Sequence, residues 1–113
     1  MPYIQIRTNK EITKEQEIAI KERLGEAITI VGKSESWLMI EFVPNCNLYF
    51  KGNSEEPIAF VDVKLYGKSD STSYNNLTGE ICASIQNNLQ IPSNNIYISY
   101  AEYINWGWNG RNF

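Results

Sequence analysis

The chain contains the same order of elements twice: a strand, a helix and a second strand, with a proline directly before the first strand of each half. Pro2 precedes an alternating segment over 3–8, and Pro57 precedes a strongly strand-like segment over 58–66. Two strand-helix-strand units with right-handed crossovers place parallel strands in one sheet and both helices on one face. The pattern therefore predicts an α+β fold, a β-α-β-β-α-β pseudo-repeat with a mixed four-stranded sheet.

The spacing of apolar residues sets the expected boundaries of the other elements. Thr13 and Gln16 have capping-box spacing, and apolar residues then recur at helical spacing until Gly32. The first helix is therefore expected to end just before Lys33. The remaining expectations are strands over 37–42 and 96–101, a second helix whose apolar stripe runs over 77–89, and a polar loop over 47–56 with a short edge strand at 48–50.

A chain of 113 residues is long enough for one domain and too short for two of ordinary size, so we expect a single domain over 1–113. One face of the predicted sheet has no helix to cover it. A domain this small also leaves much of its surface exposed. Both features favour an oligomer, and the simplest partner for the uncovered face is another copy of the chain.

Composition excludes several classes of function. The net charge is −3 and no run of Lys and Arg occurs, so nucleic-acid binding is not expected. No leader segment or membrane-spanning apolar stretch is present, which predicts a cytoplasmic protein without a membrane partner. The cysteines, Cys46 and Cys82, are too few and too far apart for a disulfide framework, and we expect reduced structural thiols.

The absence of histidine restricts the possible chemistry further. Without histidine the chain cannot form a Ser-His-Asp triad, a Cys-His pair or a histidine-containing zinc site. Acid-base chemistry is left to carboxylates, lysines, tyrosines and the terminal amine. We predict no metal and no cofactor.

An ordered set of short motifs resembles the macrophage migration inhibitory factor family, which includes D-dopachrome tautomerase. The motifs are Met1-Pro2, Gly32-Lys33, Val43-Pro44, F-x-G-x-S-x-x-P over 50–57, Gly67-Lys68, IYISY over 96–100 and the ending GWNGRNF. They run from end to end at nearly constant spacing. The resemblance implies a homotrimer with a pocket at each subunit interface, and keto-enol tautomerisation of phenylpyruvate-like α-keto acids or dopachrome-like substrates.

The resemblance also implies that Pro2, once Met1 is removed, is the catalytic base. A terminal amine has a pKa of about 8, and burial or a nearby cation lowers it toward neutrality. Lys33 would bind the substrate carboxylate and lower the pKa of Pro2. The bland alternatives are that Pro2 merely follows a start codon, and that Lys33 compensates the dipole of the preceding helix.

Further pocket residues are carried over from the family. Tyr66 occupies the position of a backbone amide that contacts substrate, and Tyr97 and Ser99 share one face of the last strand. Tyr97 is also explained by the ordinary preference of strands for aromatic residues. A weaker group of aromatic residues fits either a pocket wall or interface packing: Tyr3, Trp37, Trp106, Trp108 and Phe113.

The chain departs from the family pattern in ways that bear on function. The CxxC pair of the vertebrate cytokine is replaced by the sequence over 58–61, so no thiol-disulfide activity is expected. Ser99 replaces the family asparagine, and the connection after the fourth strand is shorter. The alternative function is a cytokine-like signalling protein that leaves the cell without a leader, binds a protein receptor, and keeps the pocket as a vestige.

Overall fold

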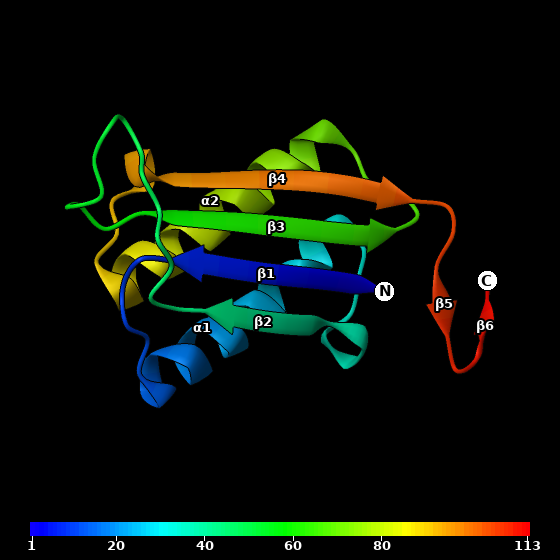
Figure 1. Cartoon of the computed structure of the whole chain (residues 1–113). Helices are drawn as coiled ribbons and strands as arrows, with labels where there is room; N and C mark the ends of the chain where they lie inside the picture. Colours follow the sequence, from blue (N-terminus) through cyan, green and yellow to red (C-terminus); the bar gives the residue numbers. More distant parts are fainter.

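The computed structural model describes residues 1–113 and shows a four-stranded sheet with two helices on one face (Figure 1). The strands are β1 (Pro2–Thr8), β2 (Met39–Val43), β3 (Ala59–Tyr66) and β4 (Ile96–Tyr103). Their order across the sheet is β2-β1-β3-β4. β1 is parallel to β2 and antiparallel to β3, while β3 is parallel to β4. The predicted mixed sheet is confirmed.

The two helices begin at side-chain caps that the sequence encodes. At α1 (Lys14–Ala27) the backbone amide of Gln16 donates to the Thr13 hydroxyl, and the Thr13 amide donates to the Gln16 side chain. The Asp70 carboxylate caps α2 (Ser71–Leu89) by accepting from the backbone amide of Ser73. The α-helical conformation of α1 ends four residues earlier than expected, since a 3₁₀ turn, η1 (Ile28–Val31), leads to Gly32.

The core lies between the helices and one face of the sheet. Alternate residues of β1 and β3 point toward the helices and are buried, which follows from the two-residue period of a strand. The Thr8 hydroxyl is also buried and donates to the carbonyl of Ile58 at 2.7 Å, so it joins the end of β1 to the start of β3. The largest buried side chains include Ile4, Ile6, Ile20, Leu24, Leu65, Leu77, Ile81 and Leu89.

Two strand predictions were wrong because short turns occupy those segments. Trp37 lies in a 3₁₀ turn, η2 (Glu35–Trp37), whose preceding Ser34 side chain accepts from a backbone amide of the turn. β2 therefore begins at Met39. The expected edge strand at 48–50 is absent, because Lys51 and Gly52 have positive φ angles and turn the chain back into an isolated Phe50–Asn53 bridge.

A second short turn, η3 (Ser93–Asn95), leads into β4, and the chain ends in a hairpin of two strands, β5 (Gly107–Trp108) and β6 (Arg111–Asn112). Figure 1 places this hairpin at one end of the sheet, beside the N-terminus and the ends of β3 and β4. The loop between β2 and β3 lies at the opposite end. No helix is both long and apolar enough to cross a membrane.

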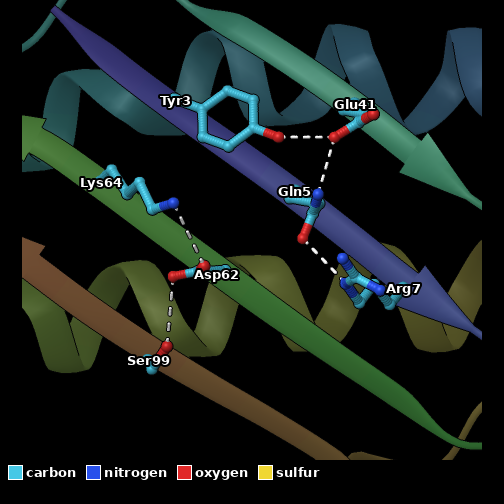
Figure 2. A network of polar contacts seen from close by, with 7 residues as sticks. All are labelled: Tyr3, Gln5, Arg7, Glu41, Asp62, Lys64 and Ser99. Carbon is cyan, nitrogen blue, oxygen red and sulfur yellow. Dashed lines mark hydrogen bonds and ion pairs between the residues drawn. The ribbon is translucent and has the colours of Figure 1, made fainter. Parts of the chain in front are cut away.

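The face of the sheet away from the helices carries polar side chains from all four strands (Figure 2). The Tyr3 hydroxyl and the Gln5 amide both donate to the Glu41 carboxylate, at 2.5 and 2.7 Å. On β3 and β4, the Asp62 carboxylate accepts from Ser99 and pairs with the ammonium of a lysine. The uncovered face is therefore suited to a wet environment.

Candidate active site around Pro2

Pro2 is the first residue of β1 and lies opposite Leu65 of β3, on the buried side of the strand. A proline is tolerated there because the first position of a strand does not have to donate a ladder hydrogen bond. An open cavity of about 600 Å³ adjoins it. The cavity is lined by Met1, Pro2, Tyr3, Ser36, Trp37, Leu38, Met39, Lys64, Trp106, Gly107 and Trp108.

Met1 is held against the end of β3. Its carbonyl oxygen accepts a hydrogen bond from the backbone amide of Tyr66 at 3.0 Å. Burial lowers the pKa of the Met1 amine, and the nearby Lys33 ammonium lowers it further. While Met1 is attached, the Pro2 nitrogen is a tertiary amide without a basic lone pair. Removal of Met1 leaves a secondary amine at Pro2 and frees the Tyr66 amide.

Lys33 reaches the same end of β3 from the far side of the first helical segment. Gly32 adopts a left-handed conformation with φ 77°, which ends the 3₁₀ turn and redirects the chain. The Lys33 ammonium then donates to the carbonyl oxygen of Tyr66 at 2.8 Å. It lies over Gly67, where a Cβ atom would be 3.5 Å from the ammonium nitrogen. The cation is thus fixed near the Met1 amine rather than free in solvent.

The predicted aromatic residues gather at this end of the molecule, in two layers. Trp37 and Trp108 meet edge to face with ring centroids 5.0 Å apart, and both line the cavity. Phe113 does not line it but stacks on Tyr66, with centroids 5.2 Å apart, and on Trp108 at 6.4 Å. The C-terminal hairpin is therefore held to the sheet by ring contacts, and its tryptophans become a wall of the cavity.

Two predicted site residues lie elsewhere in the chain. Tyr97 pairs with Phe60 and Pro2 pairs with Leu65, so Tyr97 and Pro2 are about 17 Å apart along the direction of the strands. Tyr97 is 58% exposed and contacts the ring of Phe50 at the opposite end of the sheet. One chain alone therefore does not bring Tyr97 to Pro2.

Ser99 is also separated from Pro2. It lies on the uncovered face of the sheet, where its hydroxyl donates to the Asp62 carboxylate at 3.4 Å (Figure 2). It shares this face with Tyr97, as the two-residue spacing predicted.

Sequence reasoning missed Lys64, which lies on the cavity wall opposite Tyr3 in the β1–β3 register. Its spacing from Asp62 and Tyr66 indicates the uncovered face, but only the antiparallel register of β1 and β3 brings it beside Pro2. A small apolar cavity of about 100 Å³ next to Tyr97 was also missed. It is lined in part by Phe50 and Phe60.

Comparison with known proteins assigns the chain to a family. The family model for macrophage migration inhibitory factor matches residues 1–113. The chain belongs to the macrophage migration inhibitory factor family. The resemblance carried by the ordered motifs is therefore confirmed.

Individual relatives agree with the family model over their whole length. Macrophage migration inhibitory factor of Xenopus laevis is 29% identical over 115 residues, covering 100% of this chain and 99% of the relative. The crystal structure of Leishmania major MIF2 superposes with a TM-score of 0.94 at 27% identity, covering 100% of this chain and 97% of that one. The homologue from Prochlorococcus marinus gives a TM-score of 0.87 at 28% identity, with 98% of each chain covered.

Membership of the macrophage migration inhibitory factor family supports a tautomerase-type isomerase or cytokine-like function at the level of the family. The molecule contains no cluster of three or more His, Cys, Asp or Glu side chains placed to hold a metal ion. Its ionisable groups near Pro2 are the terminal amine, Lys33, Lys64 and tyrosines.

Proposed function

We propose that the protein is a keto-enol tautomerase of phenylpyruvate-like α-keto acids, with the amine of Pro2, exposed by loss of Met1, as its base. The observation that supports this most directly is the surroundings of the N-terminus. Burial and the Lys33 cation already lower the pKa of the Met1 amine, and the same two effects act on an amine at Pro2. Such an amine is neutral near physiological pH and able to accept a proton.

The reaction needs a single group that moves one proton between carbon and oxygen. In the direction from enol to keto, the enol hydroxyl loses its proton to the Pro2 nitrogen while the carbonyl forms. The resulting Pro2 ammonium returns that proton to the carbon beside the carbonyl, and the amine is again neutral. No net proton is gained or lost, so no cofactor is required. The proline ring fixes the direction of the nitrogen lone pair.

Lys33 and the backbone amide of Tyr66 would bind the substrate carboxylate. The Met1 carbonyl already shows that the Tyr66 amide accepts an oxygen partner at 3.0 Å. Loss of Met1 leaves this donor unpaired beside the Lys33 ammonium, and a carboxylate satisfies both. The tryptophans of the cavity would then pack against the aryl group of the substrate.

The pocket would be completed by a neighbouring copy in a homotrimer. Tyr97 and Pro2 lie at opposite ends of the sheet, and Tyr97 is exposed. A head-to-tail interface, which a closed ring of three copies uses, brings opposite ends of two chains together. Tyr97 and Ser99 of one copy would reach the Pro2 cavity of the next by this arrangement. The ring of Tyr97 would add to the aromatic wall.

The proposal is tested by comparing wild type with Pro2→Gly in an enol-keto assay of phenylpyruvate, after mass spectrometry has verified that both proteins lack Met1. Glycine keeps a terminal amine but removes the ring that orients it. We expect kcat/KM to fall by at least about tenfold in Pro2→Gly, because a misdirected base transfers protons less efficiently. Equal activity in the two proteins, or inactive Met-free wild type, would show that the proposal is wrong.

A further inference from the structure

Lys64 is a positively charged residue on the wall of the Pro2 cavity that the proposed mechanism does not use. It belongs to β3 and lies opposite Tyr3 of β1. Apart from the terminal amine, Lys64 is the one charged group among the residues that line this cavity. Lys33 lies outside this lining and donates to the Tyr66 carbonyl instead. The two lysines therefore have different positions relative to Pro2.

The Lys64 ammonium is held in place by neighbours that are themselves held. It lies 3.7 Å from a carboxylate oxygen of Asp62 and 5.6 Å from the centroid of the Tyr3 ring. The other oxygen of Asp62 accepts from Ser99, and the Tyr3 hydroxyl donates to Glu41 (Figure 2). These contacts orient the side chain without burying it, since 39% of it remains exposed.

The ammonium retains capacity for an anionic ligand. An ammonium group has three donor hydrogens, and the pairing with Asp62 is long for a charge-assisted hydrogen bond. The position along β3 is also informative, because Lys64 precedes Tyr66 by two residues, a rise of about 7 Å. An aryl group spans a comparable length between a carboxylate held at the Tyr66 amide and a substituent directed back along β3.

We propose that Lys64 binds a second carboxylate on the substrate, so that the site prefers aryl α-keto acids with a carboxylate at the far end of the ring. This inference rests on the proposed tautomerase function of the same cavity. One carboxylate lies at Lys33 and the Tyr66 amide, the ring lies against the tryptophans, and the second carboxylate pairs with Lys64. Ion pairing at a partly exposed site gives selectivity between substrates of different charge.

The test compares two substrates on one aromatic frame, phenylpyruvate and 4-carboxyphenylpyruvate, with Met-free protein. The preference is the ratio of their kcat/KM values. In Lys64→Met, which removes the charge but keeps most of the length, we expect this ratio to fall by about five- to tenfold while phenylpyruvate turnover stays within about twofold of wild type. Lys64→Arg and the distant surface control Lys14→Met should keep the wild-type ratio.

An unchanged ratio in Lys64→Met would overturn the inference, as would an equal fall in Lys14→Met. Failure of the tautomerase proposal is recognised separately, as wild type that does not turn over phenylpyruvate. Binding then decides the matter for Lys64, with tryptophan fluorescence quenching by benzoate and by benzene-1,4-dicarboxylate. A dicarboxylate preference that falls about fivefold in Lys64→Met supports the inference, and equal preference in the two proteins refutes it.

Discussion

Replacing Lys33 by methionine removes a cation that has two partners at the proposed site. Its ammonium donates to the Tyr66 carbonyl at 2.8 Å, and its charge is one of the two causes that lower the pKa of the N-terminal amine. Methionine keeps the length of the side chain and its packing. The substitution therefore separates the charge from the shape of Lys33.

The magnitude follows from the interactions that are lost. A hydrogen bond to a charged group contributes about 1.5–3 kcal/mol, so loss of the carboxylate contact should lower kcat/KM for phenylpyruvate by about 10- to 100-fold, mainly through KM. Loss of the bond to the Tyr66 carbonyl should lower the free energy of unfolding by about 1 kcal/mol.

The pH dependence has a definite sign. The Lys33 cation disfavours the ammonium form of its neighbour, so its removal raises the pKa of the Pro2 amine. Because the neutral amine is the active form, the acidic limb of the kcat/KM profile should move to higher pH.

The assay is ketonisation of phenylpyruvate enol across the pH range from 5 to 9 on wild type, Lys33→Met and the control Lys14→Met, whose lysine pairs with Glu17 on the surface of α1. The control should match wild type in both KM and pH profile. Unchanged KM in Lys33→Met would refute the carboxylate role. An unshifted acidic limb would refute the effect of Lys33 on Pro2.

Three further predictions follow from the geometry. Mixing inactive Pro2→Gly with inactive Tyr97→Ala should restore about a quarter of the wild-type sites, because a trimer joins the intact Pro2 of one copy to the intact Tyr97 of the next, and no recovery would contradict the shared pocket. Ile81→Ala removes a fully buried side chain and should lower the free energy of unfolding by about 2–5 kcal/mol in urea titrations, whereas the half-exposed Ile18→Ala should cost less than about 1 kcal/mol. Burial, and then the carboxylate of Glu102, raise the pKa of Tyr74 to about 12, so the stability that its neutral form gives should be lost between about pH 10 and 12. Tyr74→Phe should flatten that loss when stability is measured against pH.

Sequence periodicity predicted the sheet well because alternate burial is a local property of a strand. β1 and β3 show the buried-exposed alternation that their sequences predict. The turn at Trp37 was missed because a serine cap three residues earlier overrides the alternation that continues into β2. The C-terminal hairpin was also out of reach, since strands of two residues have no measurable period.

The candidate site was predicted only in part, because its assembly depends on register. The residues at Pro2, Lys33 and Tyr66 were named from the family resemblance, and the structure brings these three together. The role of Lys64 needed the antiparallel pairing of β1 with β3, which no local pattern specifies. The distance of Tyr97 from Pro2 also follows from register rather than from residue type.

The central claim is that the free nitrogen of Pro2 is the base. It is tested most directly by the rate of phenylpyruvate ketonisation in two preparations of the same sequence, one with Met1 and one without, each verified by intact mass. The account predicts turnover only in the Met-free preparation, because Met1 acylates the Pro2 nitrogen and its carbonyl occupies the Tyr66 amide. Equal rates in the two preparations would contradict it.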